Sequence, residues 1–206
     1  MVTLEVGGLT PADVELVDIA VEKQLPTIGW SSGKRPAYAA EYAALKNGQV
    51  DAIFVKGARG YESANEHGVK IVYDVRQHPD PKVRANNGAP RPITVDAALL
   101  RERPDLVVRF LSQIVEVSDW AARHEAETVA YIAKESGSTD EWVRKAYGED
   151  IHLHQGTDLD PESIAALEGY KNFLLEWGFI KDDFDVQAWI DPSALAEVQR
   201  LKKKAA

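Results

Sequence analysis

Two short segments of the sequence combine cations, hydroxyls and glycines in a way that suits the binding of an anion. The first reads WSSGKR over residues 30–35. It comes just before a predicted helix, and the free N–H groups at a helix N-terminus favour negative charge. We therefore predict that Trp30, Ser31 and Ser32 contact an anionic ligand. The alternative is a solvated loop in which the tryptophan packs at the rim.

The second segment reads KGARGY over residues 56–61. Its two glycines permit close approach of a ligand to the backbone. The guanidinium of Arg59 suits a two-pronged hydrogen bond to an acidic group, and Tyr61 offers a hydroxyl or a stacking face. We predict Lys56, Arg59 and Tyr61 as ligand contacts. The competing interpretation is a solvent-facing turn, or a salt bridge to a part of the protein outside this chain.

Other chemistry receives less support from the residues. The chain contains no cysteine, which excludes disulfides, thiolate nucleophiles and Cys-ligated zinc within it. His152 and His154 form an alternating pair, but no third ligand stands at a diagnostic spacing. No phosphate-binding glycine motif or nucleophile-elbow motif occurs. We expect no metal, no cofactor and no catalytic residue in this chain.

Net charge and hydropathy exclude some classes of binding partner. The 206 residues include 24 Lys and Arg against 33 Asp and Glu, a net charge of −9, and 45% are apolar. Such a composition is that of a globular chain with a sizeable core. The negative charge argues against nucleic acid as a partner, because nucleic-acid binding requires a basic surface. No apolar run approaches 18 residues, and no signal peptide is expected in this chain.

The two candidate anion-binding segments need helices or strands to position them. The first third of the chain predicts an α/β arrangement. Each of three β-branched runs has the length of a strand and is bounded by turn residues. These runs are residues 14–21, 50–55 and 69–75, with helices predicted between them over residues 36–47 and 61–67. Alternation of strands and helices is typical of a parallel sheet. Both candidate segments would then follow the carboxyl end of a strand, where open sheets bind ligands.

The rest of the chain predicts helices after a short strand at residues 92–95. Pro104 is well placed to open a helix, and Ser138 with Glu141 forms a capping-box pattern. The predicted helices cover residues 104–124, 125–135, 138–148, 160–177 and the stretch after residue 191. Such a long run of helices has no strands of its own to cover. The chain therefore looks like part of a larger fold.

Four segments carry a resemblance to a known family. They are GLTPADVELV (8–17), AALKNGQVDAIFV (43–55), residues 93–137 and residues 170–195. Together they resemble the later half of bilobed solute-binding proteins of the sulfonate/nitrate/taurine type. The same half is similar to the aromatic sulfinate desulfinase built on that scaffold.

The resemblance implies the second half of a bilobed, periplasmic-binding-protein-like (type II) α/β fold, with a parallel-sheet lobe followed by a mainly helical segment. Residues 1–90 would be the latter part of the second lobe. Residues 91–206 would be a hinge strand and the helical remainder of the first lobe. The implied function is uptake of a small organic anion, such as a sulfonate, by cleft closure. The implied setting is an ABC transporter with a membrane permease, in a periplasmic or extracytoplasmic location.

Two alternatives stay open at this point. One is a desulfinase-like enzyme on the same scaffold, in which the resemblance implies a cysteine nucleophile in the half that this chain does not contain. The other is that the chain has lost small-molecule binding and pairs with another chain that supplies the first lobe, since its unpaired sheet edges need cover. The isolated chain is expected to be an oligomer or a marginally stable monomer. Ligand binding rather than catalysis is the main expectation.

Overall fold

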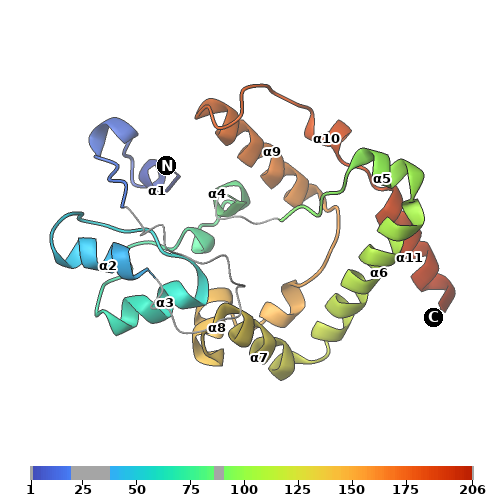
Figure 1. Cartoon of the computed structure of the whole chain (residues 1–206), viewed down its shortest axis with the longest axis horizontal. Helices are drawn as coiled ribbons and strands as arrows, with labels where there is room; N and C mark the ends of the chain where they lie inside the picture. Colours follow the sequence, from blue (N-terminus) through green and yellow to red (C-terminus); the bar gives the residue numbers. More distant parts are fainter. Residues whose placement is uncertain (1, 20–37, 86–90, 206) are drawn as a thin grey trace. The chain divides into compact units, whose positions relative to one another are not determined.

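The computed structural model describes residues 2–19, 38–85 and 91–205, and every regular element in those ranges is a helix (Figure 1). The chain forms two compact units. Unit 1 comprises Met1–Gly7, Tyr73–Ser118 and Gly156–Ala206, and unit 2 comprises Gly8–Val72 and Asp119–Gln155. The predicted division into residues 1–90 and 91–206 concerns the lobes of a larger protein and stays a prediction.

The predicted α/β fold with a parallel-sheet lobe is wrong, because no described residue belongs to a β-strand. The described parts of the four predicted strands are irregular: residues 14–19, 50–55, 69–74 and 92–95. A β-branched run becomes a strand only when a neighbouring strand completes its hydrogen bonds. Leu16 is 70% exposed and Val72 is 87% exposed. These side chains are therefore not packed between a sheet and its covering helices.

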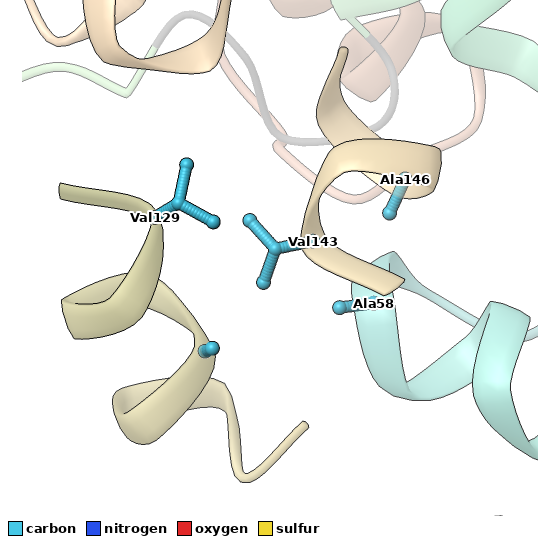
Figure 2. Packing of buried hydrophobic residues seen from close by; sticks show 5 residues of the cluster. Ala58, Val129, Val143 and Ala146 are labelled. Atoms are coloured by element: carbon cyan, nitrogen blue, oxygen red, sulfur yellow. The ribbon is translucent and has the colours of Figure 1, made fainter. Parts of the chain in front are cut away.

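Unit 2 is built around a small helical core. Its helices are α2 (Ala39–Lys46), α3 (Gly57–Glu66), α7 (Glu125–Ser136) and α8 (Asp140–Tyr147), with the 3-10 turns η1 (Pro11–Asp13) and η3 (Ile151–His154). Helix α8 packs against both α3 and α7. Val129 of α7 and Val143 of α8 are fully buried and point toward one another, with Ala58 of α3 beside them (Figure 2). The start of α3 therefore packs on the apolar core that α7 and α8 form.

The turn between α7 and α8 has a different polar contact from the one that the sequence predicts. Helix α7 ends at Ser136 and is followed by Gly137, whose φ of 66° is left-handed, as is common after the last turn of a helix. The predicted capping box of Ser138 and Glu141 is wrong: Thr139 is the N-cap residue of α8. The hydroxyl of Ser138 instead donates to Glu62 Oε2 at 2.8 Å. This hydrogen bond ties the turn to α3.

Unit 1 contains the remaining helices. They are α1 (Val2–Val6), η2 (Val75–Gln77), α4 (Pro81–Ala85), α5 (Ala97–Glu102), most of α6 (Pro104–Ala121), α9 (Pro161–Glu176), α10 (Val186–Trp189) and α11 (Ser193–Ala205). Helix α9 packs against α4 and α10, while α6 and α11 share an apolar cluster. No helix in the described ranges is both long enough and apolar enough to cross a membrane.

Acidic groups around α9 make the stability of unit 1 depend on pH. Asp160 caps α9 by accepting from the N–H of Ser163 at 2.9 Å. Hydrogen bonds from Ser163 lower the pKa of Asp160 from 3.8 to about 2. Lys171, which is buried, donates to Asp183 Oδ1 at 2.6 Å and lowers the pKa of that carboxyl as well.

We expect the free energy of unfolding to fall as the pH drops from about 4 to about 2. A carboxyl whose pKa is lower in the folded state stabilises the fold above its unfolded pKa, and that contribution disappears on protonation. Asp160→Asn keeps a capping side chain that cannot titrate. The free energy of unfolding of this variant should therefore decline less steeply over this pH range. Urea unfolding followed by circular dichroism measures the slope, with the exposed Asp182→Asn as control. Equal slopes for the wild type and Asp160→Asn would contradict this expectation.

Candidate functional site

Lys56, the residue that precedes α3, has its backbone held by hydrogen bonds to Tyr38. Lys56 is the N-cap residue of α3, with an extended backbone and an exposed side chain. The hydroxyl of Tyr38 accepts from the N–H of Lys56 at 2.9 Å and donates to the Lys56 carbonyl oxygen at 3.2 Å. Both backbone groups of Lys56 are therefore fixed by one phenol.

Tyr38 has an unusual backbone conformation. Its φ of 60° and ψ of 30° lie in the left-handed region, and it is the only non-glycine residue with positive φ in the described ranges. This conformation costs a non-glycine residue roughly 1–2 kcal/mol. The two hydrogen bonds to Lys56 offset part of that cost. Strain of this kind is concentrated at functional sites, which makes the start of α3 the leading candidate in unit 2.

Gly57, the first residue of α3, brings a second tyrosine to the same place. Its φ of 63° is left-handed, and a Cβ added there would overlap the hydroxyl of Tyr147 and lie 3.3 Å from its ring carbon Cζ. Only glycine allows both the left-handed backbone and the close approach of Tyr147 without rearrangement. The close approach places the phenol of Tyr147, from the end of α8, against the first turn of α3.

These groups suit an aromatic anion. The first N–H groups of a helix have no partner within the helix, and the helix dipole favours negative charge at that end. The Nζ of Lys56 adds a full positive charge and lies 5.6 Å from the centre of the Phe54 ring. Phe54 is 57% exposed, so its ring offers an apolar face next to the cation. An acidic group and an aromatic ring in one ligand would match this pair.

Arg59 makes contacts that hold the site together. Its Nη1 donates to the carbonyl oxygen of Gly137, and its Nε lies 4.0 Å from Glu62 Oε2. Since Glu62 also accepts from Ser138, three side chains link α3 to the α7–α8 turn. A positioning role for Arg59 therefore stands beside the predicted ligand role, which stays a prediction.

The other predicted contacts have different surroundings. Tyr61 is half-buried and packs against the apolar core of unit 2. Its ligand role stays a prediction. Trp30, Ser31 and Ser32 lie outside the described residues. Of the predicted contacts that the structure describes, Lys56 is the one beside the strained tyrosine and the exposed aromatic ring.

A second polar group of unit 2 lies on α2 and α3. The ring of Tyr42 stacks on His67 with 4.3 Å between centroids, and Lys46 Nζ lies 3.1 Å from His67 Nδ1. Tyr42 is only 2% exposed, and its hydroxyl has no hydrogen-bond partner among the described residues. Burial raises the pKa of Tyr42. The phenol therefore stays protonated at neutral pH and is not suited to act as a base.

His152 and His154 are the pair that the sequence offers as metal ligands, and in the structure His154 contacts an aspartate. His154 Nε2 lies 2.9 Å from Asp150 Oδ2, and this contact lowers the pKa of the aspartate. Nearby, Arg144 donates to Glu125 Oε1 at 2.7 Å and to Glu149 Oε2 at 2.9 Å. Within residues 2–19, 38–85 and 91–205, no three His, Cys, Asp or Glu side chains are grouped for a metal ion.

Sequence reasoning missed Tyr38 and Tyr147. Tyr38 follows the predicted anion-binding loop closely, but nothing in its neighbours signals a left-handed backbone at a tyrosine. Tyr147 comes from α8, far along the chain from α3, and only packing brings it near. The adjacent lysine and glycine at positions 56 and 57 were the sequence signal that pointed to this place.

Sequence comparison identifies related enzymes. The chain is 26% identical over 204 residues to the 2'-hydroxybiphenyl-2-sulfinate desulfinases of Rhodococcus erythropolis and Rhodococcus qingshengii. The match covers 94% of this chain and 53% of each enzyme. The chain thus spans about half the length of the curated relatives that it matches. No family model matches the chain.

Comparison with solved structures gives a related backbone. The crystal structure of a cysteine-to-serine mutant of DSZB in complex with biphenyl-2-sulfinic acid matches 96% of this chain and 58% of its own chain. The TM-score is 0.73 and the sequence identity is 24%. At this identity the match shows likeness of fold alone.

These comparisons correct the main functional expectation. The assignment to transport as a solute-binding protein is wrong, because the relatives found are desulfinases. The ABC permease as a partner stays a prediction. The homology to desulfinases agrees with the enzyme alternative. The expected extracytoplasmic location, the small-anion ligand and the absence of nucleic acid as a partner stay predictions.

Proposed function

We propose that this chain is part of an enzyme that removes a sulfinate group from an aromatic compound, and that it binds the sulfinate at the start of α3. The main support is the 26% identity to 2'-hydroxybiphenyl-2-sulfinate desulfinase across 94% of the chain. Because the match covers only 53% of that enzyme, we assign to this chain the binding part of the activity.

The geometry of the site supports this class of substrate. A sulfinate carries its negative charge on two oxygens, and the N–H groups of the first turn of α3 with Lys56 Nζ are donors for such a group. The exposed ring of Phe54 lies beside that cation. An aryl sulfinate would place its charge at the helix end and its ring against Phe54.

The bond-breaking step needs groups beyond this chain. Loss of the sulfinate breaks the ring carbon–sulfur bond, adds a proton to the ring carbon and releases the sulfur as sulfite with an oxygen from water. The chain contains no cysteine, and family resemblance implies a cysteine nucleophile in the half that it does not contain. Its own residues would bind and orient the anion, and Arg59 would keep α3 in place.

Binding and turnover can be measured separately. Calorimetry of the chain with biphenyl-2-sulfinic acid should show saturable 1:1 binding, with weaker binding of an alkyl sulfonate that lacks the ring. A colorimetric sulfite assay on the same samples should show no release. No binding of the aryl sulfinate, or equal affinity for the alkyl sulfonate, would refute the proposed site. Sulfite release by the chain alone would refute its assignment as the binding part.

A further inference from the structure

Helix α6 has two apolar faces, and only one of them is covered. The covered face packs on α11 through a cluster of Val107, Leu111, Ala194 and Val198 (Figure 1). On the other face, Leu106, Phe110 and Val117 are 37%, 56% and 64% exposed. Single exposed apolar residues are common on protein surfaces, whereas contiguous apolar surface marks interaction sites, and these three follow one another along one line of one helix.

The spacing of this face is that of a helix pair. Leu106, Phe110, Gln113 and Val117 follow one another at intervals of four, three and four residues. Alternating intervals of four and three keep side chains on one seam between two packed helices. We call these four residues the α6 stripe. All of them belong to unit 1.

Two exposed charges flank the stripe on the side away from the covered face. They are Arg109 and Glu116, seven residues apart. If a second α6 packs antiparallel about a two-fold axis, Leu106 faces Val117 of the second copy and Phe110 faces its Gln113. Arg109 of each copy then lies opposite Glu116 of the other, so that the two charge pairs form together. A parallel pair would place Arg109 opposite Ile114, without a complementary charge.

We propose that the α6 stripe binds a second copy of this chain, forming an antiparallel two-fold dimer with two Arg109–Glu116 pairs. The self-complementary order of apolar residues and charges supports this occupant. One helix pair buries less than the roughly 1,200–2,000 Å² of a stable interface. The dimer should therefore be weak and depend on protein concentration.

Charge reversal tests the pairing directly. In sedimentation equilibrium the wild type should dimerise with rising concentration, whereas Arg109→Glu and Glu116→Arg should each dimerise at least about tenfold more weakly because like charges face each other twice. Mixed in equal amounts, the two variants should form a heterodimer, since both charge pairs become opposite again. The double variant Arg109→Glu/Glu116→Arg should dimerise like the wild type.

Matched reversals at exposed positions off the stripe, Arg123→Glu and Glu135→Arg, serve as controls and should dimerise normally. Circular dichroism verifies that every variant is folded. A wild type that stays monomeric at all concentrations would overturn the proposal and assign the stripe to a different partner, such as the part of the longer relatives that this chain does not span. Dimers insensitive to the single reversals, or no heterodimer in the mixture, would equally overturn it.

Discussion

Replacing Val143 with aspartate should abolish the folded state of unit 2. Val143 is completely buried between α3 and α7, where it packs on Val129 and Ala58 (Figure 2). A carboxylate in this apolar cluster would have no partner to compensate for the loss of water, which costs several kcal/mol. Since whole domains are stable by only about 5–15 kcal/mol, we expect hydrogen exchange to show loss of protection in α3, α7 and α8.

A smaller change at the same position calibrates this result. Val143→Ala leaves a small cavity and should lower the free energy of unfolding by about 1–3 kcal/mol, with the fold retained. Ala130, which is exposed on α7, offers a control for an introduced aspartate without burial. Retention of wild-type protection in Val143→Asp would contradict the core as described. Equal effects of Val143→Asp and Ala130→Asp would contradict it as well.

Reversing the charge of Lys56 should weaken binding of biphenyl-2-sulfinic acid by at least about 10–100-fold. A hydrogen bond between charged groups contributes roughly 1.5–3 kcal/mol, and each 1.4 kcal/mol changes an affinity tenfold. Lys56→Glu removes this bond and adds repulsion at the helix end. Calorimetry at constant ionic strength measures the loss, because exposed charges are screened by salt.

Controls separate the loss of binding from the loss of fold. Lys70→Glu changes another exposed lysine of unit 2 and should bind normally. Arg59→Ala should lower the melting temperature, because Arg59 contacts Gly137 and Glu62, whereas Lys56→Glu should not. If the double variant Lys56→Ala/Arg59→Ala kept wild-type affinity while folded, the ligand site would lie elsewhere.

The helices were predictable where local signals set their ends. Helix α6 begins at Pro104 and α9 begins at Pro161 behind the capping Asp160, because proline fits the first turn of a helix and a capping carboxylate satisfies its free N–H groups. Helix α7 ends at Ser136, before Gly137, because glycine adopts the left-handed conformation without strain. Each signal acts within a few residues, so no distant partner is needed.

The strands were wrong for the opposite reason. Residues 50–55 and 69–74 have strand-like composition, but pairing depends on another strand that composition does not supply. Similarly, the capping pattern at Ser138 was overridden when its hydroxyl bonded to Glu62 from α3. The strands failed for want of a distant partner, and the capping pattern failed because a distant partner was present.

The sequence by itself determined the negative charge, the absence of cysteine, the main helix ends and the placement of Lys56 beside a glycine. Only the tertiary structure brought Tyr38 to that lysine and Tyr147 to the glycine beside it, gave Arg59 its contact with Gly137 and left the α6 stripe uncovered. Backbone propensity and charge are properties of neighbouring residues, whereas packing joins residues that the chain separates widely. The α3 site depends on packing of that kind.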